Sequence, residues 1–197
     1  MIDAIVGTRL RNLAREGVLS AAVLLALSTS LDAQSPIRLR NVTGPSEISF
    51  CHSDGSGGHR YIVETVASGL ATFDYDGDGR IDVYFVTGTP LQGTKYDVMP
   101  KNRLYRNAGG FKFVDVTDQA GVGEAGYGLG VCIGDYDNDG RPDIYLSNFG
   151  PNVMFRNNGD GTFSNVTRRA GTGAANRRKA GAGVCFLDMD KDGELDL

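Results

Sequence analysis

Three short acidic segments of the sequence carry the residues best placed to do chemistry. Each follows the pattern Asp-x-Asp-x-Asp-Gly-x-x-Asp, and the segments cover residues 74–82, 135–143 and 188–196. Together they hold twelve aspartates, in a chain that has 24 acidic residues and a net charge of only −4. Acidity that served solubility alone would be spread over the surface. The local crowding of like charge therefore indicates that each segment folds around a cation.

The spacing of the aspartates indicates the kind of cation. Carboxylates at positions one, three and five of a tightly curled loop can be aimed at one point, and the glycine at position six permits the positive φ that tightens the curl. Such hard oxygen ligands suit Ca²⁺, whereas Mg²⁺ needs a stricter octahedron and keeps more of its water. The alternative reading, a set of solvated Asp-Gly turns, would suit a single loop with fewer carboxylates.

The flanking sequences place these loops between strands and not between helices. A calcium loop of the EF-hand type needs a glutamate at position twelve, where this chain has Phe85 and Leu146. The runs GLATF, GVCIG and GVCFL before the loops, and DVYFVTG and DIYLSN after two of them, are short and rich in β-branched and aromatic residues, as is typical of strands. Each loop is therefore expected to be the turn of a β-hairpin, with the ninth-position aspartate in place of the missing glutamate.

A second repeated element lies between the acidic loops. Residues 102–121 match residues 152–171 at a constant offset of 50, and LRNVT at 39–43 repeats the closing strand of this element. Turns that contain glycine divide each copy into two short strands. The strands expected to pair are 102–106 with 111–116 and 152–156 with 162–166. Units of four short strands that repeat every 50 to 60 residues or so predict the blades of a β-propeller.

The loops and hairpins together resemble the FG-GAP/VCBS repeats of the cartilage acidic protein family. The resemblance rests on DYDGDGRIDVYF and DYDNDGRPDIYL, joined to NRLYRNAGGFKFVDVT and NNGDGTFSNVT, and covers roughly residues 37–197. It implies an all-β fold, a secreted calcium-binding β-propeller of four-stranded antiparallel blades, related in architecture to the integrin α-subunit head. Bacterial members often carry a C-terminal ASPIC/UnbV module. Because the sequence stops at Leu197, inside a blade, the propeller is expected to be incomplete in this chain.

Carried over position by position, the resemblance implies one calcium ion in each acidic loop. Aspartate side chains bind it from positions one, three, five and nine, and calcium loops often add the backbone carbonyl of position seven. The implied ligands are Asp74, Asp76, Asp78, Arg80 and Asp82 in the first loop, Asp135, Asp137, Asp139, Arg141 and Asp143 in the second, and Asp188, Asp190, Asp192, Glu194 and Asp196 in the third.

Residues 1–34 are expected to be a secretory signal peptide, with the repeats in residues 35–197. Arginines at 9, 11 and 15 precede the apolar run VLSAAVLLALSTSL, and Ala33 offers a cleavage point. The run is shorter than the roughly 20 residues that span a bilayer, although an uncleaved anchor remains the alternative. We therefore expect a secreted, periplasmic or cell-surface protein with no membrane span after signal cleavage.

The repeats are not expected to form an enzyme, because no nucleophile, base and orienting group come together in the sequence. Cys51 and His52 are adjacent, but neighbours on a strand point to opposite faces. Cys132 and Cys185 occupy equivalent positions of their repeats, and whether they form a disulfide is left open, since their Cα atoms would need to lie within about 7 Å. The cysteine spacing fits neither a zinc site nor a redox motif.

The sequence favours a non-catalytic binding module in which calcium rigidifies the loops and the loop-bearing face recognises an extracellular protein or a carbohydrate. The alternative is the scaffold part of an exported enzyme whose catalytic residues lie in a C-terminal portion outside this sequence. Nucleic acid is not an expected partner, and the basic cluster at 176–179 is expected to be a solvated turn. Asn41 and Asn165 fit the N-glycosylation pattern, but the repeated closing strand already accounts for both.

Overall fold

The computed structural model describes residues 39–59, 61–66, 68–91, 94, 97–173, 181 and 183–197. The predicted signal peptide and the basic cluster at 176–179 lie outside these residues. Nearly all of the described chain falls within one folded unit, residues 41–197. No helix among the described residues is long and apolar enough to cross a membrane.

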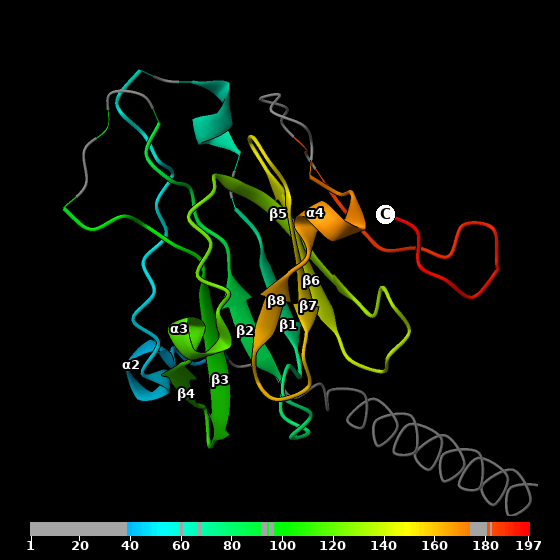
Figure 1. Cartoon of the computed structure of the whole chain (residues 1–197). Helices are drawn as coiled ribbons and strands as arrows, with labels where there is room; N and C mark the ends of the chain where they lie inside the picture. The colour runs from blue at the N-terminus through cyan, green and yellow to red at the C-terminus, as the bar shows by residue number, and fades with distance from the viewer. Residues whose placement is uncertain are drawn as a thin grey trace, which may run out of the picture. The chain divides into compact units, whose positions relative to one another are not determined.

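Two four-stranded antiparallel sheets follow one another along the chain (Figure 1). In each sheet the strands pair in the order in which they occur in the sequence. The first sheet contains β1 (Leu70–Phe73), β2 (Asp82–Phe85), β3 (Arg103–Gly109) and β4 (Lys112–Asp115). The second contains β5 (Gly128–Gly134), β6 (Asp143–Asn148), β7 (Val153–Asn157) and β8 (Phe163–Asn165). The all-β fold and the two hairpin pairings expected from the sequence are therefore confirmed.

All three acidic segments form hairpin turns. The first two join β1 to β2 and β5 to β6, and the antiparallel pairing of these strands reaches the ninth residue of each loop. The third is closed by an isolated antiparallel bridge, in which the backbones of Leu187 and Asp196 exchange hydrogen bonds of 3.0 and 2.8 Å. The segment 183–187, expected as a strand, forms only this bridge in the described part of the chain.

A single helical turn follows the closing strand of each sheet. These turns are α3 (Thr117–Ala120) after β4 and α4 (Thr167–Ala170) after β8, and a third, α2 (Thr43–Ser46), follows the earlier copy of the motif. The short 3₁₀ helix η1 (Ile62–Thr65) lies between α2 and β1. Residues 39–43, expected as a third closing strand, pair with no strand of the described chain, so only the helical turn of that copy, which begins at Thr43, is formed.

The repeated Asn/Asp-Val-Thr sequence explains where the helical turns begin. Oδ1 of Asp115 accepts hydrogen bonds from the backbone N–H and the hydroxyl of Thr117, at 3.0 and 2.5 Å. Asn165 does the same for Thr167, at 3.1 and 2.7 Å. Side-chain acceptors of this kind satisfy backbone donors at the start of a helix. The structural role that the sequence assigned to Asn165 is thus visible in the fold.

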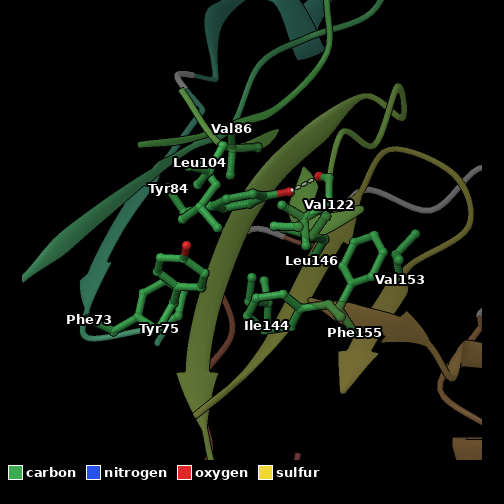
Figure 2. Close-up of a cluster of buried hydrophobic side chains, with 13 residues drawn as sticks. Phe73, Tyr75, Tyr84, Val86, Leu104, Val122, Ile144, Leu146, Val153 and Phe155 are labelled. Carbon is green, nitrogen blue, oxygen red and sulfur yellow. Dashed lines mark hydrogen bonds between the residues drawn. The ribbon is translucent and has the colours of Figure 1, made fainter. Parts of the chain in front are cut away.

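The main core lies between the facing sides of the two sheets (Figure 2). Aromatic and branched side chains from both sheets meet there, and the phenol of Tyr84 donates a hydrogen bond of 2.8 Å to the carbonyl of Val122. The buried residues are Phe73, Tyr75, Tyr84, Val86, Leu104, Val116, Ala120, Val122, Ile144, Leu146, Val153, Phe155 and Phe163. Burying a large apolar side chain is worth about 1.5–3 kcal/mol, so this interface holds the sheets together.

The second sheet buries its opposite face as well. Along β6, Ile144 packs in the main core, whereas the next residue, Tyr145, belongs to a second cluster. Val184 and Phe186, at the start of the third repeat, pack on that second cluster, and the rings of Tyr145 and Phe186 lie 6.5 Å apart. A sheet with two apolar faces has to be covered on both sides. The second sheet is therefore an internal layer between the first sheet and the third repeat.

Gly128, the first residue of β5, allows the two sheets to approach closely. A β-carbon added there would lie 2.0 Å from Cγ1 of Val86, a buried core residue. At Gly130 the nearest atom would be 3.7 Å away, an ordinary contact. We expect Gly128→Ala to lower the free energy of unfolding by about 2 kcal/mol through overpacking, as measured by chemical denaturation. Gly130→Ala is the matched control, and equal losses in the two variants would contradict this account.

Candidate metal centres

Asp74, the first residue of the first acidic loop, fixes the backbone of that loop. Its carboxylate accepts hydrogen bonds from the backbone N–H groups of Gly77, Asp78 and Gly79, at 2.9, 3.1 and 2.8 Å. Gly77 and Gly79 have φ values of +74° and +81°, which other residues adopt only with strain. The first aspartate therefore shapes the loop in addition to charging it.

The second and third loops repeat this arrangement. Asp135 accepts hydrogen bonds from the backbone N–H groups of positions five and six, at 2.9 and 2.7 Å, and Asp188 accepts one from position six, at 3.1 Å. Position four is left-handed as well, with φ of +55° at Asn138 and +65° at Lys191. The sequence predicted a positive φ at position six alone, so the left-handed conformation of position four was not predicted.

The aspartate at position nine ties each loop to its surroundings. Asp82 accepts hydrogen bonds from the backbone N–H of Tyr75 at 3.0 Å and from that of Asn107, on β3, at 2.7 Å. Asp143 accepts the equivalent pair at 3.1 and 2.7 Å, and Asp196 accepts one from position two of its loop at 2.9 Å. The side chains of Asp82 and Asp143 are fully buried. Position nine therefore joins the loop to the hairpin that follows it.

Burial makes these two carboxylates costly to ionise. Desolvation raises the pKa of Asp82 above its usual range and raises the pKa of Asp143 to about 6, although two backbone hydrogen bonds to each carboxylate act in the opposite direction. The other aspartates of each loop raise these pKa values further. A positive charge in the loop would offset both effects, so the buried aspartates favour a cation beside them.

Three aspartates of each loop bring carboxylate oxygens to within 4.8 Å of one another. The converging sets are Asp74, Asp76 and Asp78 in the first loop, Asp135, Asp137 and Asp143 in the second, and Asp188, Asp190 and Asp196 in the third. The side chains that were predicted as ligands but lie outside these sets are those of Asp82, Asp139 and Asp192.

The residues at position seven donate their backbone N–H groups to the aspartates at position five, at 2.9, 3.1 and 2.8 Å. Their carbonyls remain predicted ligands: Arg80, Arg141 and Glu194.

The donor atoms fit calcium. Every converging group is a carboxylate, and Ca²⁺ prefers hard oxygen ligands. In addition, Oδ1 of Asp188 is buried and has no hydrogen-bond partner within the described part of the chain. An unsatisfied buried carboxylate oxygen is unfavourable, and a bound cation would satisfy it.

Two arginines from the following hairpins also contact the loops. Arg156, on β7, donates a hydrogen bond of 2.5 Å to Asp137 and a further one to Asp139. Arg106, the equivalent residue on β3, lies 3.9 Å from Asp76. Both arginines lie in the segments that repeat at an offset of 50, but the sequence alone assigned them no role. Their recurrence was the signal that could have found them.

Asn107 and Asn157, which follow these arginines, connect the acidic loop to the second turn of each sheet. The side-chain amides donate to the carbonyl at loop position eight, at 3.0 Å for Ile81 and 3.2 Å for Pro142. Their side-chain oxygens accept the backbone N–H two residues further along, at 2.9 Å in both sheets. The two turns of a repeat are thus built as one hydrogen-bonded unit.

The cysteines and His52 form no catalytic pair among the described residues. Cys51, Cys132 and Cys185 are free, so the disulfide left open by the sequence is absent from this structure. The thiol of Cys51 donates to the backbone carbonyl of His52, at 3.8 Å, and not to its ring. Burial raises the pKa of the Cys132 thiol to about 12, with a smaller contribution from Cys185. Cys132 therefore stays protonated as part of the second cluster.

The repeated sheets and acidic loops define a class of protein. Residues 74–146 and 135–197 match the family described as FG-GAP-like repeat, and the chain belongs to that family. It is similar to cartilage acidic protein 1, with 37% identity to the Mus musculus protein and 32% to the Homo sapiens protein over 133 residues, and 33% to the Xenopus tropicalis protein over 131 residues. These matches cover 65% of this chain and 20% of each relative. The predicted family resemblance is confirmed, and the chain spans about a fifth of the length of these relatives.

Proposed function

We propose that this chain is part of an extracellular β-propeller in which calcium ions rigidify the acidic loops and the loop-bearing face binds a protein or carbohydrate partner. One observation carries the proposal. Three carboxylates converge in each of three loops that occupy equivalent places in successive repeats, from positions one, three and five in the first loop and from positions one, three and nine in the other two. Three loops built on the same hydrogen bonds indicate a shared ligand, and their all-carboxylate donor sets suit calcium.

The stacking of the repeats supports the propeller. Each complete sheet is a four-stranded meander whose first turn is an acidic loop. The second sheet is covered on one face by the first sheet and on the other by the start of the third repeat. Repeats that each cover the next in this way can close into a ring, typically of about four to eight blades. We propose that blades outside this sequence complete such a ring.

Calcium would stabilise the loops and would take no part in a reaction. The converging carboxylates would hold the ion, and the ion would supply the positive charge that the buried ninth-position aspartates lack. The first and ninth aspartates would remain bound to backbone N–H groups through their other contacts. A loop braced in this way presents a rigid surface, and rigid surfaces lose less entropy when they bind a partner.

A location outside the cytoplasm fits both the metal and the N-terminal sequence. Extracellular calcium modules work with dissociation constants of about 10⁻⁴ to 10⁻³ M, which the crowded but largely exposed loops can supply. The charged start, the apolar run and Ala33 fit a secretory signal. The similarity to a protein named for cartilage, an extracellular tissue, supports the same location.

We propose a non-catalytic role for this part of the protein. Its reactive side chains are accounted for by the fold, since Cys132 is a core residue and the Cys51 thiol contacts a backbone carbonyl. The second candidate is the scaffold of an exported enzyme. It is favoured by the fact that the chain covers only 20% of its relatives, which leaves room for catalytic residues elsewhere. The reading frame after Leu197 distinguishes the two, because a further catalytic domain would favour the enzyme.

The number of bound calcium ions tests the metal sites directly. We expect isothermal titration calorimetry to show one ion for each acidic loop, and Asp137→Ala to lower the stoichiometry by one because Asp137 belongs to a converging set. Asp118→Ala is the matched control, since it removes an equal charge from α3, where Asp118 pairs with Lys101 outside the loops. Equal stoichiometry in the wild-type protein and both variants would refute the proposed sites.

A further inference from the structure

Arg156 reaches from β7 across the second acidic loop and binds two of its carboxylates. Its Nε donates a hydrogen bond of 2.5 Å to Oδ2 of Asp137, and its Nη2 donates to Oδ2 of Asp139. The three side chains are only 28%, 26% and 17% exposed. Partial burial strengthens charge-assisted hydrogen bonds of this kind. The guanidinium is therefore a fixed positive charge at the edge of the candidate metal site.

Both carboxylate oxygens of Asp139 accept hydrogen bonds from arginines. Its Oδ2 also accepts a hydrogen bond from Nη2 of Arg141, and its Oδ1 accepts one from the backbone N–H of Arg141 at 3.1 Å. Asp139 is also the predicted ligand of the second loop that lies outside the converging set. Two guanidinium groups thus contact the one carboxylate of the second loop that lies away from the point at which the other three meet.

The first loop provides a natural comparison. Arg106 occupies the same place as Arg156, but it lies 3.9 Å from Asp76 and is more exposed, at 44%. The fifth-position aspartate, Asp78, contacts Arg80 and converges with Asp74 and Asp76. The two loops have the same aspartates and the same two arginines, and they differ in the contacts of the second arginine, which reaches the fifth-position aspartate only in the second loop.

We propose that Arg156 is an internal counter-cation of the second loop, which competes with calcium for Asp137 and Asp139 and makes the second site weaker than the first. The inference rests on the proposed calcium function. A calcium ion that takes up all four carboxylates of the second loop must first displace the bridging guanidinium of Arg156, whereas in the first loop Arg80 contacts Asp78 alone and Arg106 lies 3.9 Å from Asp76. Repeats with nearly the same acidic sequence would then fill at different calcium concentrations.

The first and second loops each carry their own spectroscopic reporter. Tyrosine occupies position two of the first and second loops, as Tyr75 and Tyr136, whereas the third loop has Met189 there. Terbium(III) substitutes for calcium and luminesces when a nearby tyrosine is excited. In a Tyr75→Phe background, the sensitised signal should therefore report mainly on the second loop. In a Tyr136→Phe background it should report mainly on the first.

The test is the affinity for terbium, with displacement by calcium, in the intact protein. In the Tyr75→Phe background, Arg156→Gln is expected to tighten binding about three- to tenfold, the size expected for removing two partly exposed ion pairs. Arg156→Lys keeps the charge but cannot bridge both carboxylates, so its affinity should lie between those of the parent and Arg156→Gln. Unchanged or weaker binding in Arg156→Gln would overturn the proposal, because it would make the arginine a support for the site.

Arg106→Gln in the Tyr136→Phe background is the matched control. Because Arg106 makes one long ion pair, its removal should change the affinity of the first loop by less than about twofold. Equal tightening in both loops would overturn the proposal, since it would reflect only the loss of a nearby positive charge. The absence of any saturable signal in the two parent proteins would refute the calcium function itself. The far-ultraviolet circular dichroism spectrum of each variant, recorded with terbium, verifies that the affinities compared are those of folded proteins.

Discussion

Chelation of calcium with EDTA is expected to lower the thermal midpoint of the intact protein by roughly 15 °C or more. A ligand that binds only the folded state adds about 2.7 kcal/mol per site when it is present at a hundredfold excess over its dissociation constant. Three sites would thus add about 8 kcal/mol. The physical source is the loop charge, because four carboxylates held close together repel one another without a cation.

The midpoint should be measured in millimolar calcium, in EDTA, and in EDTA followed by excess magnesium. Magnesium is expected to restore little of the thermal midpoint that is lost in EDTA, because Mg²⁺ requires strict octahedral coordination and gives up its bound water reluctantly. Full recovery with magnesium would indicate general charge screening in place of specific coordination. A midpoint that is the same in calcium and in EDTA would contradict structural calcium and leave the acidic turns unexplained.

The hairpins were predictable because their signals are local. Alternating β-branched and aromatic residues on each side of a glycine-containing turn specify two short strands and their connection. This is why β3 with β4 and β7 with β8 pair as expected. The same signals also predicted strands at residues 39–43 and 183–187, which the structure does not form in full. Strands depend on hydrogen bonds to a partner, and neither segment has a full partner strand in the described chain.

The candidate sites were predictable in residue type and only partly in geometry. Asp74 and Asp135 lie in their converging sets, as their spacing suggested. The spacing could not show that Asp82 would be drawn into backbone hydrogen bonds with β3, or that Arg156 would reach Asp139. These contacts join residues 17 to 25 positions apart, and they depend on how the second hairpin of a repeat packs beside the first. A loop motif read on its own does not contain that information.

Asp143 and Asp139 belong to the same loop, yet their removal is expected to have very different effects. In millimolar calcium, Asp143→Ala should lower the free energy of unfolding by about 3 kcal/mol more than Asp139→Ala does. Asp143 is fully buried and accepts the backbone N–H groups of Tyr136 and Asn157, at 3.1 and 2.7 Å. Alanine would leave both donors unsatisfied. The contacts of Asp139 are with arginines that can turn to water and with loop backbone near the surface.

The difference between the two variants should narrow in EDTA, and this narrowing ties the buried aspartate to the cation. Burial raises the pKa of Asp143 to about 6, so its ionised form at neutral pH destabilises the fold unless a positive charge lies beside it. Without calcium, Asp143→Ala removes that unfavourable charge together with the two acceptors, and the two changes partly cancel. Urea denaturation of both variants, with and without calcium, measures the four free energies of unfolding. Equal losses for Asp143→Ala and Asp139→Ala in calcium, or a difference that stays the same in EDTA, would show that the ninth position is an ordinary loop carboxylate without a special link to the metal.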